Sequence, residues 1–271
     1  MTPLAPSTEL LRTLRGYVAG MADGPEPSPS ALVPRPSVGR VFEEARRVRL
    51  ADVSPSGRLR LDAATRYLQD LSADDTADAA LPDAEAWVVR RTVIEIRQFP
   101  RYLEALELAT WCSGIGSHYA ERRISVLGER GGAVEAATTW VHVDQATGRP
   151  KRVPDGFADL YGEAAAGRRI KARLSHDGPP DDVERAPWPL RFTDFDVLDH
   201  VNNAAYWEAV EETLAAHRDL RAPLRAELEH RSAVERHAFV ERCHRRDADG
   251  VLRVWLAADG TVAASAVLRT L

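Results

Sequence analysis

Hydrophobic and polar positions change periodicity several times along this chain. Residues 41–50 have the pattern of a strand, and after a turn containing Pro55 and Gly57 the apolar residues of 61–72 recur at helical spacing. Strand-like runs separated by short turns follow at 87–97, 102–114, 117–129 and 133–144. This order predicts a strand, a helix and then an antiparallel meander.

The second half of the chain repeats this order. We expect a strand at 189–192 and a helix from about 204 to 216, with N-caps at Asp62 for the first helix and Asn203 for the second. Four strand-like runs follow, at 225–233, 237–245, 250–258 and 261–270. The repetition indicates an internal duplication.

Superposing the halves pairs three identical residues: Arg49 with Arg191, Asp52 with Asp194 and, after a three-residue gap, Tyr67 with Tyr206. A long central helix wrapped by an antiparallel sheet is the hot-dog arrangement, and one copy normally pairs with a second. The predicted fold class is therefore α+β, with two tandem hot-dog domains, each a long central helix wrapped by an antiparallel β-sheet.

Composition suggests where these domains begin and end. Residues 1–40 are rich in Pro, Ser and Gly, which is typical of a flexible tail, although Leu10 to Val18 contain apolar residues at helical spacing. The first hot-dog domain is expected at 41–152 and the second at 188–271. Residues 153–187 form the expected linker between them, which is too long for a tight turn.

Charge and cysteine content exclude several classes of protein. The 271 residues carry 41 acidic and 36 basic side chains, a net charge of -5, so a nucleic-acid partner is not expected. Cys112 and Cys243 are too few for a disulfide framework, which favours a reducing, cytoplasmic location. We expect no membrane span, because no apolar run reaches 18 residues. Neither cofactor nor metal is expected, because dinucleotide and phosphate-loop motifs are missing and the histidines are scattered.

The candidate chemistry lies in RFTDFDVLDHVNNAAYWEAVEE, residues 191–212, where an acidic loop leads into an amphipathic helix. Asn residues before a helix are more often caps than catalysts, but capping does not explain the Asp-x-x-x-His pair. Asp196 has the chemistry of a nucleophile or general base, and His200 that of a group that orients water or polarises a carbonyl. Backbone N–H groups at the start of the helix would stabilise an oxyanion.

This segment resembles the Asp-Leu-Asp-x-Asn-x-His-Val-Asn-Asn-x-x-Tyr motif of plant plastid and bacterial acyl-acyl-carrier-protein (acyl-ACP) thioesterases. RQFPRYLEALELATWCSGIGSHYAERRISVL and TTWVHVDQATGRPKRVP in the first half resemble further strands of that family. The resemblance covers about residues 41–271. It implies a tandem hot-dog fold and the hydrolysis of fatty acyl-ACP to free fatty acid and holo-ACP.

Carried over residue by residue, the resemblance gives a catalytic Asp at Asp196 and a catalytic His at His200. The family's Asn two residues before the His is replaced by Leu198, and its strand Glu aligns with Ala233. Glu235, on the same strand face by alternation, is the candidate replacement. With the family's Asn and Glu replaced, Asp196 is expected to act as base or nucleophile, with His200 or Asn202 assisting it.

Two other functions stay open at this point: an acyl-CoA thioesterase, or a weakly active acyl-binding hot-dog protein. A hot-dog dehydratase or hydratase is a third, and it would release no thiol. The resemblance implies an acidic acyl carrier protein as partner, and the candidate basic residues to receive it are Arg46, Arg47, Arg168, Arg169, Lys171 and Arg173. A homodimer is compatible with the pattern.

Overall fold

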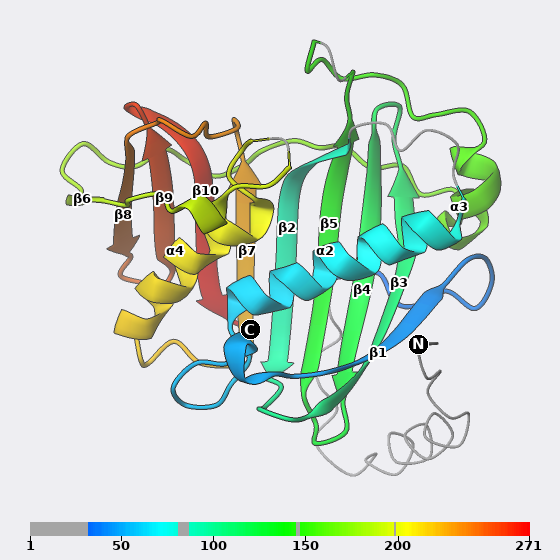
Figure 1. Cartoon of the computed structure of the whole chain (residues 1–271), viewed down its shortest axis with the longest axis horizontal. Helices are drawn as coiled ribbons and strands as arrows, with labels where there is room; N and C mark the ends of the chain where they lie inside the picture. The colour runs from blue at the N-terminus through cyan, green and yellow to red at the C-terminus, as the bar shows by residue number, and fades with distance from the viewer. Residues whose placement is uncertain (1–31, 81–86, 145–146, 198) are drawn as a thin grey trace.

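A single antiparallel sheet runs through the part of the chain that the computed structural model describes, residues 32–80, 87–144, 147–197 and 199–271. Leu198 and most of the predicted tail lie outside these ranges, including the apolar stretch from Leu10 to Val18. The strand order is β1-β3-β4-β5-β2-β7-β10-β9-β8-β6 (Figure 1). The strands are β1 (Phe42–Arg47), β2 (Trp87–Gln98), β3 (Ala105–Ile115), β4 (Tyr119–Gly128), β5 (Ala133–His142), β6 (Arg185–Pro187), β7 (Leu224–His230), β8 (Val240–Arg246), β9 (Leu252–Ala258) and β10 (Thr261–Thr270).

Two long helices cross the same face of this sheet and pack against each other (Figure 1). They are α2 (Leu61–Asp78), over the first half, and α4 (Asn203–Ala216), over the second. A shorter helix, α3 (Phe157–Ala165), packs beside β3, and 3₁₀ turns at η1 (Leu50–Asp52) and η2 (Phe192–Asp194) precede the two long helices. The predicted α+β class and the duplicated order of helix and antiparallel strands are confirmed.

Strand alternation explains the core under these helices. Leu106 and Leu108 of β3 and Ile124 and Val126 of β4 are almost completely buried in the cluster that contains the apolar face of α2. The amphipathic helix predicted after the acidic loop is α4, and its apolar stripe belongs to the same cluster: Tyr206, Trp207, Val210 and Leu214. One apolar core therefore extends across both halves.

The halves join through the central pair of strands, β2 and β7. Their antiparallel register runs from Arg91 opposite Glu229 to Ile96 opposite Leu224. This pairing gives the two halves a shared sheet and leaves β1 and β6 as its edges.

The segment between the halves crosses the sheet on the face opposite the helices. The N–H of Ile115 donates to the carbonyl of Arg168 at 3.0 Å, and the N–H of Ser175 donates to the Glu229 carboxylate at 2.7 Å. Glu229 alternates with the core residue Leu228, so it points away from α4. The segment ends as β6, which pairs with β8.

Three local predictions were wrong. The strand expected at 189–192 lies at β6 instead, because the carboxylate of Asp194 draws the chain before it into the η2 turn. The N-cap of α4 is Asn202, one residue earlier than expected, and Arg60 takes that position before α2. Asp62 lies inside α2 and pairs with arginines instead.

Candidate active site

A buried carboxylate fixes the entry to the candidate loop. Asp194 accepts hydrogen bonds from the backbone N–H of Arg191 at 2.7 Å and from its guanidinium at 2.7 and 3.0 Å. The N–H of Asn202 donates to the carbonyl of Asp194 at 2.8 Å, which closes the base of the loop. Asp194 therefore shapes the loop, with both carboxylate oxygens committed to Arg191.

Beyond Asp194 the chain forms a short hairpin-like loop. Phe195 and Val201 form an antiparallel bridge, and the N–H of Asp196 donates to the carbonyl of His200 at 3.0 Å. Asp199 donates its N–H to the carbonyl of Asp196 and has a φ of +59°, a left-handed conformation that Asp tolerates better than most residues. The loop thus brings the half-buried Asp196 and the exposed His200 together across its two arms.

The loop leads directly into the N-terminus of α4. The Asn202 side chain accepts a hydrogen bond from the Ala204 N–H at 2.9 Å, so it caps the helix. The helix dipole gives this terminus a partial positive charge. Asp196 and His200 therefore lie in the loop that precedes an anion-stabilising helix start.

A second loop, between β7 and β8, lies beside the first. The N–H of Val201 donates to the carbonyl of Val234 at 3.0 Å, and His200 forms an antiparallel bridge with Glu235. Ala233 and Glu235 are exposed, whereas Val234 between them is buried. The structure thus brings all four predicted site residues into two adjoining loops: Asp196, His200, Asn202 and Glu235.

The same β7–β8 loop restrains the tip of the candidate loop. Arg236 forms an ion pair with Asp199, and its guanidinium lies 4.7 Å from the ring centre of Phe195. Neither contact was predicted, because the pattern around Arg236 carries no capping or helical signal. Arg236 is a candidate positioning residue for the loop.

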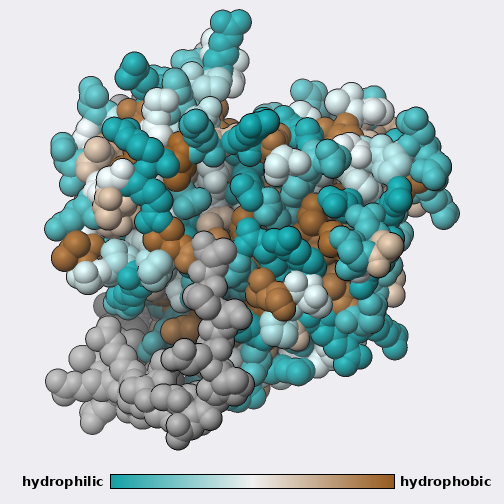
Figure 2. Space-filling model, turned by 180° about the vertical axis from the view of Figure 1, so that it is seen from behind, coloured by the Kyte–Doolittle hydropathy of each residue, from teal (hydrophilic) through white to brown (hydrophobic). Residues whose placement is uncertain are grey.

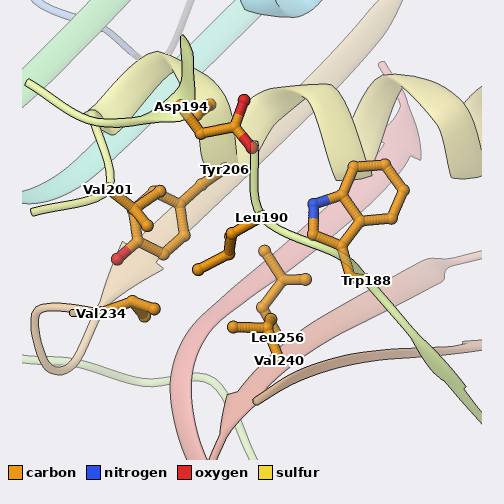
Figure 3. Close-up of a pocket in the computed structure, with 9 residues that line it drawn as sticks. Trp188, Leu190, Asp194, Val201, Tyr206, Val234, Val240 and Leu256 are labelled. Atoms are coloured by element: carbon orange, nitrogen blue, oxygen red, sulfur yellow. The ribbon is translucent and has the colours of Figure 1, made fainter. Parts of the chain in front are cut away.

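An apolar pocket opens between α4 and the β8–β9 part of the sheet (Figure 3). It contains about 300 Å³ of empty space, part of it open to solvent, and its polar side-chain groups are the Asp194 carboxylate, the Tyr206 hydroxyl and the Trp188 indole N–H. The other lining residues are Trp188, Leu190, Val201, Ala205, Val234, Val240 and Leu256. Val201 and Val234 also hold the two site loops together, so the pocket adjoins the candidate residues.

Tyr206 stands between this pocket and a buried histidine. Burial raises the pKa of Tyr206 above its ordinary value, so the phenol keeps its proton. Its ring meets that of His230 edge to face, with centroids 4.9 Å apart. Burial, followed by the charge of Arg90, lowers the pKa of His230 to about 3, so the imidazole is neutral at physiological pH. His230 Nε2 has no hydrogen-bond partner among the described residues.

The first half contains the same loop with different side chains. Val53 and Leu59 form the matching bridge, and the N–H of Ser54 donates to the carbonyl of Arg58 as that of Asp196 does to His200. The loop therefore has Ser54 in place of the acid and Arg58 in place of the histidine.

This register leaves no gap between the two loops, so Tyr206 corresponds to Ala64. Pairing Tyr206 with Tyr67 was therefore wrong. The Tyr67 hydroxyl instead donates to Asp52 at 2.5 Å.

One ligand-like group lies on the opposite face of the sheet and was not predicted. His176 of the linker meets Glu227 and Glu229 of β7, with donor atoms close enough to hold a metal ion. Burial alone would raise the pKa of Glu227, but hydrogen bonds from His176 and Arg91 lower it to about 2. Because guanidinium groups already balance these carboxylates, the cluster is better described as an ion-pair network.

The fold is that of a double hot-dog protein, with the candidate residues in the loop before α4. Residues 39–161 match the family model described as the acyl-ACP thioesterase N-terminal domain, and residues 178–260 match that of the C-terminal domain. The chain belongs to the acyl-ACP thioesterase family, and it is a thioester hydrolase.

Similar proteins agree with this family. An uncharacterized protein of Mycobacterium tuberculosis is 34% identical over 89% of this chain and 96% of its own length. The crystal structure of an acyl-ACP thioesterase from Bacteroides thetaiotaomicron superposes with a TM-score of 0.73 at 16% identity, covering 84% of this chain and 96% of that one. A 12:0-ACP thioesterase from Umbellularia californica gives a TM-score of 0.71 at 19% identity, with the same coverage. These structural matches establish the shared fold.

Proposed function

We propose that this protein hydrolyses fatty acyl-ACP thioesters to free fatty acid and holo-ACP at the two loops before α4 and after β7. The observation that carries the proposal is the meeting of Asp196, His200 and Glu235 beside the N-terminus of a helix. The counterpart loop of the first half has Ser54 and Arg58 at these positions, so it lacks the acid and the histidine.

In the proposed reaction Asp196 accepts a proton from water as the water oxygen attacks the thioester carbonyl carbon. The carbonyl electron pair moves to oxygen, and backbone N–H groups at the start of α4 stabilise that negative charge. The C–S bond then breaks, and the leaving thiolate takes the proton from Asp196. The products are the fatty acid and the carrier thiol.

The neighbouring residues have positioning roles in this proposal. His200 orients the water or donates to the carbonyl oxygen, and Glu235 orients His200 from the adjoining loop. Asn202 holds the start of the helix, because its side-chain oxygen accepts a hydrogen bond from the Ala204 N–H, and this contact fixes the orientation of its amide group. Together they take the place of the family's Asn and Glu, whose positions are Leu198 and Ala233 in this chain.

The first test is the release of free thiol from acyl-ACP and acyl-CoA substrates of graded chain length. Asp196→Asn should lower kcat/KM by about 10²–10⁴-fold, the contribution typical of a general base. Asp219→Asn is the matched control, because Asp219 is an exposed carboxylate paired with Arg246 at the far end of α4. Equal activity of Asp196→Asn and wild type would reject this assignment.

The same assay separates the alternatives. Preference for acyl-CoA over acyl-ACP would make the protein an acyl-CoA thioesterase. Acyl binding without thiol release by the wild type would favour an acyl-binding protein, with Leu198 and Ala233 marking a lapsed site. An enoyl product would indicate a dehydratase.

We further propose a cytoplasmic location, supported by two buried free thiols, Cys112 and Cys243. Within the described residues, no helix combines the length and apolar character needed to cross a bilayer. Since β1 and β6 are the sheet edges, a homodimer would form there or through the loops, and light scattering measures whether it does.

A further inference from the structure

The basic side chains of this chain are unevenly paired. Around the candidate site the arginines already have acidic partners: Arg191 binds Asp194, and Arg236 binds Asp199. Six cationic side chains between 149 and 173 form no ion pair among the residues that the structure describes. We call them the basic ridge: Arg149, Arg152, Arg168, Arg169, Lys171 and Arg173.

The ridge is exposed and stands out against the acidic charge of the whole chain. Five of its six side chains are exposed, and Arg168 is half-buried. Residues 149–173 contain seven basic and three acidic residues, whereas the chain as a whole has a net charge of -5. Unpaired like charges on one surface repel each other, so a partner of opposite charge is the stabilising arrangement.

The fold gathers the ridge at one end of the strands, where β3 and β5 finish. The N–H of Lys151 donates to the carbonyl of His142 at the end of β5, and the N–H of Ile115 at the end of β3 donates to the carbonyl of Arg168. In Figure 1 the chain after β5 projects from the upper edge of the sheet, and Figure 2 shows mostly hydrophilic side chains there.

The candidate site lies at the same end of the strands. β7 is antiparallel to β2, which is antiparallel to β5, so β5 and β7 both end there. The loop that follows β7 holds the Asp196 loop through Val234.

The ridge is also connected to the site through hydrogen bonds to β7. Its last segment is extended, with exposed Arg169, Lys171 and Arg173 alternating with less exposed Ile170 and Ala172. Directly after it, the N–H groups of Ser175 and His176 donate to the fully buried Glu229 at 2.7 and 3.1 Å. β7 ends one residue beyond Glu229, at the loop that contains Glu235.

Of the six basic candidates predicted from the sequence, the structure retains four and separates two. Arg46 pairs with Asp70 of α2, and Arg47 donates to the carbonyl of Leu103. Both lie on β1 opposite the first residues of β3, so they are at the other end of the strands from the ridge. Arg149 and Arg152 take their place beside the linker residues.

We infer that the basic ridge is the docking surface for the acidic carrier protein that presents the acyl thioester to the Asp196 loop. This inference rests on the proposed function, since it needs a carrier-bound substrate. A ridge of unpaired cations beside the site would raise the rate of encounter with an acidic partner and orient it, while the chemistry stays with the site loops.

The test compares carrier-bound and carrier-free substrates. The triple variant Arg169→Gln, Lys171→Gln, Arg173→Gln should lower kcat/KM for acyl-ACP about tenfold or more at low salt. Its kcat/KM for acyl-N-acetylcysteamine, which has no carrier, should stay within about twofold of wild type. The loss should shrink toward 1 M salt, where the Debye length falls to about 3 Å.

A matched control removes the same charge elsewhere. Three exposed arginines lie beyond the far end of α4 and on β8: Arg218, Arg221 and Arg245. Their triple Gln variant should leave kcat/KM for both substrates unchanged. An equal loss in the two variants, or no loss in the ridge variant, overturns the docking surface. An equal loss for acyl-CoA would make the ridge a phosphate-binding surface instead and also overturns it.

A second measurement uses the folded wild type. The only two lysines of the chain are Lys151 and Lys171, both in 149–173. Zero-length carbodiimide coupling to acyl-ACP should therefore give cross-links at these two lysines, and the Lys151→Arg, Lys171→Arg variant should lose them while keeping kcat/KM. Hydrolysis of acyl-N-acetylcysteamine without any such cross-link would refute the docking surface alone, whereas no hydrolysis of either substrate would refute the proposed function.

Discussion

Glu211 of α4 binds the start of α2 through a buried set of hydrogen bonds. Its carboxylate accepts bonds from the Arg58 guanidinium at 2.6 and 3.3 Å and from the backbone N–H of Leu61, the first residue of α2, at 3.0 Å. Glu211 is 7% exposed, so solvent cannot replace these bonds. Glu211→Ala therefore leaves a cation and an orphan N–H at the interface.

The magnitude follows from those two losses. An unsatisfied buried N–H costs about 1–3 kcal/mol, and a lost bond to a charged group about 1.5–3 kcal/mol. Arg58 keeps some compensation, because it lies 4.6 Å from the ring centre of Phe99. We expect Glu211→Ala to lower the free energy of unfolding by about 4 kcal/mol and, at roughly 2–4 °C per kcal/mol, Tm by roughly 8–16 °C.

The assay is thermal unfolding followed by far-ultraviolet circular dichroism, with Asp219→Ala as the control at the exposed end of α4. Arg58→Met combined with Glu211→Met should recover part of the loss, since replacing both partners removes the unpaired charge. A Tm change below about 2 °C for Glu211→Ala would refute the reasoning, because it would mean that Arg58 and Leu61 find other partners.

Two further predictions concern stability. The pKa of His230 falls from 6.5 to about 3 on folding, so below pH 6.5 the unfolded chain binds a proton that the folded chain does not, and wild type loses stability as the pH falls. His230→Phe should make this loss between pH 6.5 and 5 smaller by about 2 kcal/mol, measured by urea unfolding. Identical pH profiles would contradict this. Gly39→Ala should destabilise by about 2–4 kcal/mol, since the new Cβ would lie 2.3 Å from the Ala164 nitrogen, whereas Gly57→Ala, with a similar φ and open space, should cost only about 1 kcal/mol; equal Tm values would show that Ala164 moves aside.

Regular periodicity made most of the fold predictable from the sequence. The run predicted at 133–144 forms β5, and Val134 and Ala136, two residues apart, lie in the core cluster. The stripe of α4 was predicted for the same reason, because its apolar residues recur at helical spacing. Two copies of that order in the sequence indicated a duplicated hot-dog fold.

Two of the local errors share one physical cause, which is that a side chain bonding to the backbone outweighs a weak periodic signal. Arg191 to Asp194 form a turn because one carboxylate binds both the N–H and the guanidinium of Arg191. The choice of Asn202 over Asn203 as cap likewise depends on a single bond to Ala204. Neither can be read from hydrophobic spacing.

The candidate site was only partly accessible to the sequence. Asp196 and His200 share one short motif, so their meeting follows from local chain geometry. Glu235 comes from a separate loop, and its place opposite His200 depends on the bond between Val201 and Val234. Such long-range contacts leave no periodic signal.

The two pseudo-equivalent loops show how a duplicated fold separates stability from chemistry. The backbone hydrogen bonds that close the two loops correspond, and the difference that matters for chemistry lies in the side chains. Arg58, at the position of His200, binds Glu211 of the opposite helix and closes its loop against the other half. Within the described part of the chain His200 forms no such ion pair, and it stays exposed at the same end of the strands as the basic ridge. The first loop thus stabilises the joint between the halves, while the second leaves its carboxylate and imidazole for the proposed chemistry.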